Sequence, residues 1–179
     1  MHVPRVLSKN AGLTLVEVLT AVSLLGIVTA VAATNFNAMR PAFETRGAAL
    51  KIAGDLNQAR MTAIKESRIY EFFPISGGYR IRRDDGAGGR EVMREVVLAN
   101  EYPHVTFGHS GVTGTDPYGA ALGSSLPGGA ITFHSNGTVQ NAAGVFVESG
   151  TGDEHVQQAV TLSSAGRVRV WRYSDGAWQ

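Results

Sequence analysis

Residues 11–36 read AGLTLVEVLTAVSLLGIVTAVAATNF, and this stretch decides the organisation of the chain. After Glu17 no formal charge occurs before Arg40, so 22 uncharged residues, 18–39, follow the carboxylate. A helix of that length extends about 33 Å, at about 1.5 Å per residue, and the hydrocarbon core of a bilayer is about 30 Å thick. The stretch therefore predicts a helix that spans a membrane.

The carboxylate of Glu17 lies at the edge of this apolar stretch, where its transfer into lipid costs about 2.5–3.5 kcal/mol on insertion scales. Such a charge requires a specific role. Residues 12–17, Gly-Leu-Thr-Leu-Val-Glu, resemble the processing signature of type IV prepilins and type II secretion pseudopilins. The resemblance implies that a prepilin peptidase cuts between Gly12 and Leu13, that Leu13 is then N-methylated, and that residues 1–12 are a cleaved leader.

After such a cut, Glu17 becomes the fifth residue of the mature chain. In a filament, its carboxylate can pair with the amino terminus of a neighbouring subunit. Two opposite charges buried in an apolar bundle would then compensate each other. We therefore expect Glu17 to be the residue that governs assembly.

Two other interpretations of the N-terminal stretch are open at this point. An ordinary secretory signal peptide would use Arg5 and Lys9 as its basic region and Ala-Val-Ala at 30–32 as its cleavage site, but the apolar run exceeds the usual length of about 7–15 residues. A plain single-span anchor explains the length of the run and leaves Gly12 and Glu17 unexplained.

The composition favours a single head domain after the anchor. Of 179 residues, roughly 140 remain beyond the leader and the span, which suits one compact domain. The formal net charge is +1, and loss of the leader, with two of the 16 basic residues, brings it to about −1, so the overall charge indicates no nucleic-acid partner. No cysteine is present, so the fold depends on packing without disulfides.

A second helical segment follows the apolar stretch. Pro41 lacks a backbone N–H and disfavours helical geometry in the residue before it, so we expect a kink or a restart of the helix there. Over residues 42–67, apolar residues recur at the spacing of one helical face: Ala49, Ile52, Ala53, Leu56, Ala59 and Ala63. The charged residues of this segment lie largely off that face: Lys51, Asp55, Arg60 and Lys65. The pattern predicts an amphipathic helix that packs under a sheet.

Shorter apolar patterns predict strands in the rest of the chain. They lie at 69–75, 79–83, 91–98, 105–107, 130–134, 144–148, 158–162 and 167–172, and turn-forming residues at 76–78, 84–89 and 135–137 separate neighbouring strands. Antiparallel sheet and an α+β fold are the expected result. Residues 108–129, with seven Gly and two Pro, form an unusually long loop, which we expect to be mobile or ordered by a partner.

Motifs in this second part extend the resemblance over most of the chain. The motifs are Ala59-Arg60, Ala63-Ile64, Ile131-Thr132-Phe133, Asn136-Gly137 and Gly166-Arg167-Val168-Arg169. They resemble those of the GspH/FimT-like minor pilins and pseudopilins. In that superfamily a long N-terminal helix, of which the first half spans the membrane and the second half is amphipathic, packs on an antiparallel β-sheet head.

The resemblance also implies where the protein lies and what it contacts. Residues 13–40 would form the transmembrane and filament-core helix, and residues 41–179 would form a periplasmic head on a single-pass inner-membrane anchor. The subunit would enter a type IV pilus or a type II secretion pseudopilus, at its tip. Its partners would be other major or minor pilins or pseudopilins, the prepilin peptidase and the inner-membrane assembly platform.

No group of residues predicts catalysis, a metal site or a cofactor. The histidines at 2, 104, 109, 134 and 155 form no pair at metal-ligand spacing on a helix, and neither a GxSxG motif nor a cysteine nucleophile occurs. A periplasmic enzyme with a signal anchor is the alternative from a different class. It would need a pocket with convergent polar groups, of which the sequence gives no sign.

The segment with a binding mechanism is 166–172, Gly-Arg-Val-Arg-Val-Trp-Arg. On a strand, Arg167, Arg169 and Trp171 lie on one face, while Val168 and Val170 face the core. Arginines contact phosphates and tryptophan stacks on unpaired bases, so this face suits DNA of any sequence.

In FimT-like minor pilins the matching Gly-Arg-x-Arg segment is associated with DNA binding during natural transformation, and we include Arg172 in the candidate site. The alternatives are a solvent-facing strand, with Trp171 against the helix or another pilin, and a secretion-type tip subunit that binds no DNA.

Overall fold

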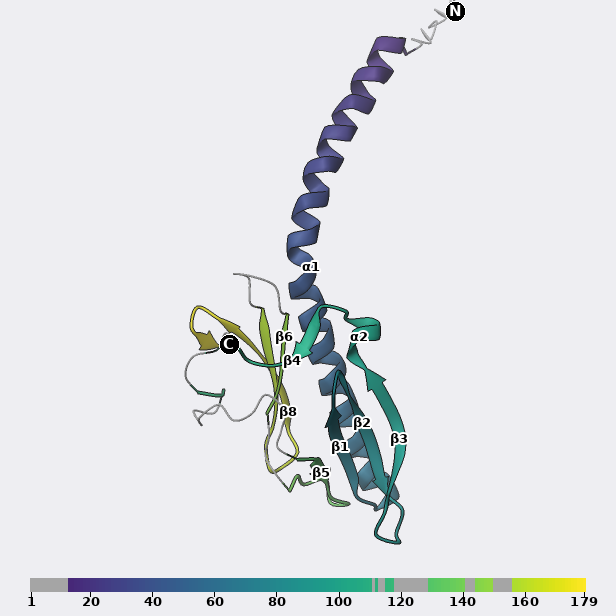
Figure 1. The fold of residues 1–179 in the computed structure, drawn as a ribbon, viewed down its shortest axis with the longest axis vertical. Coiled ribbons are helices and arrows are strands. Elements are labelled where there is room, and N and C mark those ends of the chain that lie inside the picture. Colours follow the sequence, from purple (N-terminus) through teal and green to yellow (C-terminus); the bar gives the residue numbers. More distant parts are fainter. Residues whose placement is uncertain (1–12, 111, 113–114, 118–128, 141–143, 150–155) are drawn as a thin grey trace, which may run out of the picture. The chain divides into compact units, whose positions relative to one another are not determined.

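The computed structural model describes residues 13–110, 112, 115–117, 129–140, 144–149 and 156–179. The chain divides into two compact units, Met1–Met39 and Arg40–Gln179. The elements are one long helix, α1 (Leu15–Glu66), a short helix, α2 (Leu98–Glu101), and two antiparallel sheets (Figure 1). The fold is α+β, which confirms the sequence-based prediction.

The first part of α1 satisfies its polar groups internally. The Thr14 hydroxyl accepts the backbone N–H of Glu17 at 3.3 Å, which caps the start of the helix. The hydroxyls of Thr20, Ser23 and Thr29 donate to backbone carbonyls in the preceding turn at 2.7–2.9 Å. Residues Leu15–Ala32 have a mean hydropathy of 2.2 and no buried position. By length and composition this segment can cross a membrane.

Pro41 lies inside α1, and the helix is continuous through it, so the predicted restart is wrong. A proline removes a single backbone donor, and the turns on either side keep their own hydrogen bonds. The buried hydroxyl of Thr45 also donates to the Pro41 carbonyl at 2.7 Å. Local bonding therefore continues across the proline.

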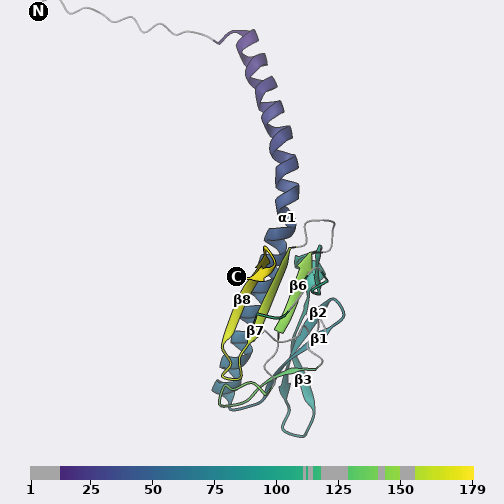
Figure 2. The same ribbon diagram turned by 90° about the vertical axis from the view of Figure 1, so that its left-hand side faces the viewer.

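The first sheet has the strand order β3-β2-β1-β5, and every neighbouring pair is antiparallel. Its strands are β1 (Tyr70–Ile75), β2 (Gly78–Asp84), β3 (Arg90–Val97) and β5 (Ile131–Phe133). The second sheet, β4-β6-β7-β8-β9, contains β4 (Val105–Phe107), β6 (Gly144–Ser149), β7 (Gln157–Leu162), β8 (Val168–Ser174) and β9 (Ala177–Trp178). Figure 2 shows β6, β7 and β8 side by side.

The predicted strands agree with eight of these nine to within two residues, and sequence reasoning missed β9. Leu98, predicted as the last residue of a strand, instead begins α2, where its side chain is buried. The loop predicted at 108–129 lies largely outside the described residues. In its described part, Val112 is buried and the Thr115 carbonyl accepts the indole N–H of Trp178 at 3.0 Å.

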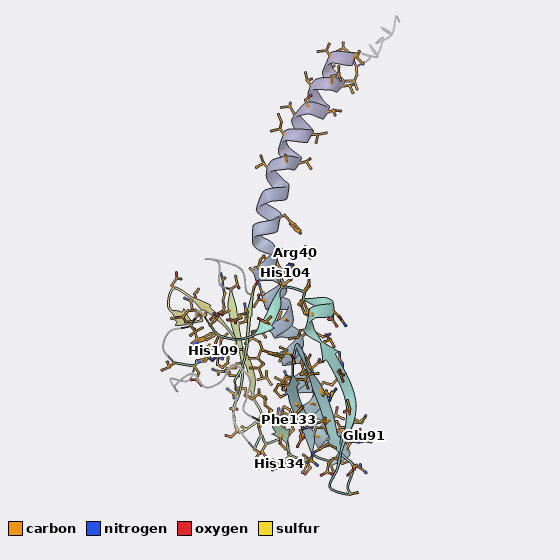
Figure 3. The ribbon with its side chains drawn as sticks, viewed as in Figure 1. Arg40, Glu91, His104, His109, Phe133 and His134 are labelled. Atoms are coloured by element: carbon orange, nitrogen blue, oxygen red, sulfur yellow. The ribbon has the colours of Figure 1, made fainter. Side chains whose placement is uncertain are left out.

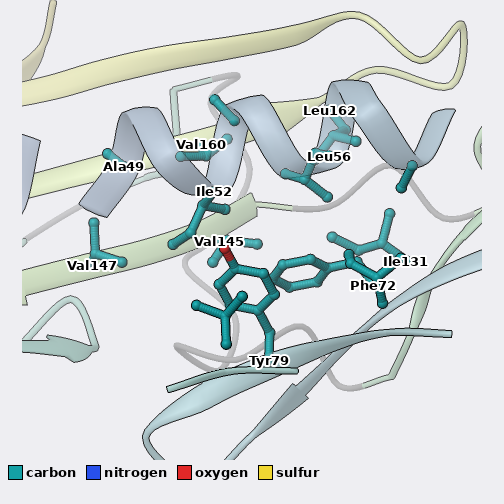
Figure 4. Close-up of a cluster of buried hydrophobic side chains, with 14 of the residues drawn as sticks. Ala49, Ile52, Leu56, Phe72, Tyr79, Ile131, Val145, Val147, Val160 and Leu162 are labelled. Atoms are coloured by element: carbon teal, nitrogen blue, oxygen red, sulfur yellow. The ribbon is translucent and has the colours of Figure 1, made fainter. Parts of the chain in front are cut away.

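The core of the head lies between the second part of α1 and both sheets. The predicted apolar face is buried at every position, from Ala49 to Ala63. In Figure 4 the side chains of Ile52 and Leu56 meet Phe72 and Tyr79, whose rings stack with centroids 4.6 Å apart. Valines of β6 and β7 surround the same helix face, so one face of α1 organises both sheets.

Asp55 contradicts the prediction that the charged helix residues lie off the buried face. Its side chain is buried, where one carboxylate oxygen accepts the Tyr79 hydroxyl at 2.5 Å and the other accepts the Arg94 guanidinium at 2.7 Å. Burial and the hydrogen bond to Asp55 raise the pKa of Tyr79. Because Tyr79 lies on β2 and Arg94 on β3, this carboxylate fixes α1 to the first sheet.

Candidate functional site

The candidate strand alternates as the sequence predicts. Arg167, immediately before β8, and Arg169, within it, are exposed, whereas Val168 and Val170 pack against the core. Cross-strand pairs connect β8 to β7 from Val168 to Tyr173, which fixes this register. The register therefore holds the exposed arginines on a rigid sheet.

Arg172 does not join the other two arginines. Alternation along β8 puts it on the same face as Val168 and Val170, away from Arg169. There it lines a groove of about 460 Å³ together with residues of α1, including Phe43 and Arg46. The structure thus separates Arg172 from the predicted DNA-binding face.

Trp171 shares the face of Arg169 and is half-buried. Its indole N–H donates to the Thr161 hydroxyl at 2.7 Å, and the Arg169 guanidinium carbon lies 5.8 Å from its ring centroid. The ring is therefore held in one orientation beside a cation, and its polar edge is already bonded.

Two aromatic residues that sequence reasoning missed continue this face. Tyr173 follows Trp171 by one alternation, and its ring lies 5.1 Å from that of Trp178 on β9. The sequence signal for this hairpin was the Asp-Gly pair at 175–176, which is typical of a two-residue turn. Both residues have positive φ in the structure, and the turn folds the last residues back onto β8. Cations therefore occupy one end of the strand face and aromatic rings the other.

Charge is distributed unevenly between the two sheets. On the first sheet every arginine forms an ion pair with a carboxylate: Arg80, Arg82, Arg83, Arg90 and Arg94. Arg167, Arg169 and Arg172 form no ion pair with any described residue. Within the two sheets, the arginines without an ion pair among described residues thus lie at β8, while Arg46, Arg60, Lys65 and Arg68, on or just after α1, also form none.

The motifs quoted from distant parts of the sequence meet at one point of the structure. The Arg60 guanidinium on α1 donates to the Gly137 carbonyl at 2.9 Å and to the Ala165 carbonyl at 3.1 Å. At Gly166, φ is +76°, and an added Cβ would lie 2.4 Å from both the Gly137 oxygen and the Arg60 Nε. This position therefore requires glycine. We call these contacts the Arg60 clamp, and they fix the turn that leads into Arg167.

Two protein families match this chain. The family described as type II transport protein GspH matches residues 48–166, and the prokaryotic N-terminal methylation motif matches residues 7–33. The first match covers two thirds of the 179 residues.

This chain belongs to the GspH family. Neither the curated proteins nor the solved structures contain a match to it. The family match confirms the resemblance drawn from the motifs. It includes Arg60, Gly137 and Gly166, which make the Arg60 clamp, and ends immediately before Arg167. The basic strand thus lies beyond the matched part of this GspH-family chain.

The N-terminal match fits the predicted processing signature and, with the apolar helix, a single-pass anchor in the inner membrane. Gly12 lies outside the described residues. Leu13 lies two residues before α1 and Glu17 in its first turn, and both residues are exposed in the isolated chain. Their assigned roles in cleavage, methylation and assembly stay predictions.

The described histidines serve separate local contacts. Figure 3 shows His104, His109 and His134 at three separate places on the head. His104 Nδ1 lies 3.0 Å from Glu44, and His109 packs edge-on against Phe146. Burial alone would raise the pKa of Glu44, but hydrogen bonds from His104 and Arg40 hold it below the ordinary value. Among described residues, no three His, Asp or Glu side chains group as metal ligands do.

Proposed function

We propose that this GspH-family chain is a non-enzymatic minor pilin-like subunit whose head binds DNA through Arg167 and Arg169. Residues 1–12 are its leader, residues 13–40 its membrane and filament-core helix, and residues 41–179 its periplasmic head. The subunit assembles with other pilins after cleavage by the prepilin peptidase and lies at the filament tip. This arrangement rests on the two family matches and the apolar helix.

The observation that carries DNA binding is the pair of exposed arginines at β8 with no carboxylate partner among described residues. Paired arginines elsewhere on the head have their charge neutralised, so they attract a polyanion less. Two residues along a strand span about 6.7 Å, so both guanidiniums can contact one phosphate backbone. Phosphate contacts carry no base information, and the binding is therefore independent of sequence.

The aromatic end of the same face favours single strands over duplex. A base can stack only when it is unpaired, and such stacking contributes about 1–3 kcal/mol per base. The bond from the Trp171 N–H to Thr161 holds the ring in one orientation on the face that carries Arg169. Trp171→Ala should accordingly weaken binding of single-stranded DNA more than binding of duplex.

The test compares two double variants of the mature chain in detergent micelles. Arg167→Gln with Arg169→Gln should weaken DNA binding for every sequence, and the slope of log affinity against log salt should fall by about 1.8 for duplex, because two phosphate contacts are lost. Fluorescence anisotropy with labelled DNA over a salt series measures the slope.

Arg46→Gln with Arg172→Gln is the matched control, since it removes the same charge from the opposite side of β8. It should keep the wild-type slope. If the wild-type chain shows no salt-sensitive binding at low salt, or if both double variants behave alike, Arg167 and Arg169 are not a DNA site.

The second candidate is a type II secretion pseudopilin that binds no DNA. The description of the matched family favours it, and the match ends before Arg167. In that case the head contacts other tip subunits or a secreted protein. Absence of DNA binding by the wild-type chain in the test above, with normal assembly, supports this candidate.

Replacement of Glu17 tests the assembly role. Glu17→Leu should leave cleavage and membrane insertion intact, because an apolar side chain enters lipid more readily than a carboxylate. Incorporation into filaments should fall strongly, because the amino terminus of the neighbouring subunit loses its countercharge. Immunoblots of sheared filaments measure incorporation, and equal recovery of variant and wild type would remove this role from Glu17.

A further inference from the structure

Among the described residues, only the end of β8 has a neighbouring strand on its outer edge. β9 pairs with β8 only at Tyr173 and Ser174, and one further pair of hydrogen bonds, both 2.8 Å long, joins Arg172 to Gln179. No described residue pairs with this edge from Val168 to Val170. A row of strand donors and acceptors is thus left without a neighbouring strand.

The alternation of backbone groups along β8 identifies which N–H and C=O groups face its outer edge. Arg172 directs its N–H and C=O toward β9, and these groups alternate sides along a strand, so those of Val170 and Val168 also face the outer edge. The odd-numbered residues face the other way, since the Arg167 carbonyl accepts the Ser163 N–H across the hairpin to β7. Val168 and Val170 together offer two donors and two acceptors.

A groove with apolar and cationic walls lies beside this edge. Its volume is about 460 Å³, and it is lined by residues of α1 and β8 together with Val156, Gln158 and Gln179. The helix contributes Phe43 and Leu50, which are 59% and 54% exposed as whole residues. Arg46 and Arg172 supply two positive charges that form no ion pair with any described residue. A strand added to β8 would direct alternate side chains into this groove.

The positive charge of the groove determines which kind of strand can bind at this edge. Arg46 and Arg172 repel another basic strand, so β8 does not pair with β8 of a second copy. The same charges favour an extended segment that carries a carboxylate. Apolar side chains two positions from the carboxylate would lie on the same face and contact Phe43 and Leu50.

We propose that the outer edge of β8 and the adjoining groove receive an extended, acidic segment of another protein chain as an additional strand. The contact extends over about four residues, roughly 13 Å, so it is weak for isolated molecules. In a filament, neighbouring subunits are held together at high effective concentration, which makes a weak contact sufficient. The surface differs from the proposed DNA face, because Arg167 and Arg169 take no part in it.

The experiment uses the isotope-labelled mature chain in detergent micelles and a synthetic peptide, acetyl-Thr-Val-Thr-Glu-Thr-Val-Thr-amide. Before peptide is added, the amides of Val168 and Val170 should exchange with solvent rapidly, whereas those of Arg169 and Trp171, which face β7, should exchange slowly. At about nine-tenths occupancy, exchange of the Val168 and Val170 amides should slow about tenfold.

Two peptide controls separate strand addition from other binding. A version with Lys in place of Glu should bind about tenfold more weakly. Two further peptides carry N-methyl groups on alternate amides, one at the odd and one at the even positions. Only one of these sets of amides faces β8, so one methylated peptide should lose binding and the other should keep it. Equal effects of both methylated sets, or equal binding of the Lys peptide, would overturn the proposal.

Protein variants test the groove independently of DNA binding. Arg46→Gln with Arg172→Gln should weaken peptide binding about tenfold, while Arg167→Gln with Arg169→Gln should leave it unchanged. Unshifted amide signals in the first sheet establish that each variant is folded. Slow exchange at Val168 and Val170 without peptide, or no change when peptide is added, would show that this edge takes no additional strand.

Discussion

Gly12→Val should abolish maturation, and the full-length precursor should accumulate in the membrane. A peptidase that cuts after Gly12 must accommodate this residue in its site, and a β-branched side chain adds bulk and restricts the backbone there. Leu13 should then never become a free, methylated terminus. Mass spectrometry of the purified variant should find an N-terminus upstream of residue 13.

Leu13→Phe is the matched control, since prepilins usually carry phenylalanine after the glycine, and it should be cut normally. The wild-type chain should begin at Leu13 with one added methyl group. A wild-type chain that begins at Ala33 would mean that an ordinary signal peptidase cuts after 30–32, and the pilin-type processing would be wrong.

Asp55→Ala should destabilise the head by about 3 kcal/mol, because it leaves the buried Tyr79 hydroxyl without its acceptor and breaks an ion pair whose carboxylate is buried. For a domain of this size, that corresponds to a fall in melting temperature of about 10 °C. Asp55→Asn should cost less, because its amide keeps one oxygen acceptor. Thermal unfolding followed by circular dichroism measures both.

Glu95→Ala is the control for this second prediction. The Arg80–Glu95 pair has the same 2.7 Å separation as the Arg94–Asp55 pair, but both of its side chains are about 40% exposed. Its loss should cost at most about 1 kcal/mol. Equal effects of Asp55→Ala and Glu95→Ala would mean that burial of Asp55 contributes nothing to its anchoring of α1.

The parts of the fold that follow a local period could be predicted from the sequence. The helix face from Ala49 to Ala63 repeats every three to four residues, and β8 alternates every two, so both are recognisable without their partners. The membrane-spanning length and the motif at 12–17 are also local properties. For these features, packing follows the pattern closely.

Features that depend on distant partners could not be predicted. The acceptor role of Asp55 depends on Tyr79 and Arg94, 24 and 39 positions away. The Arg60 clamp depends on backbone carbonyls as acceptors. Every residue carries one, so the sequence does not show which carbonyls Arg60 contacts. Arg172 is a different case, because the alternation that groups Arg167 with Arg169 already puts it on the other face, and sequence proximity misled the assignment.

The Arg60 clamp has a consequence for the redox behaviour of the head. It joins α1 to two turns that lie 77 and 105 positions along the chain, which are separations that secreted domains often close with disulfides. Here two hydrogen bonds perform that closure, and the chain contains no thiol. Thiol–disulfide exchange therefore has no substrate in this protein. The head needs no oxidase or isomerase to reach its fold, and reducing agents leave its stability unchanged.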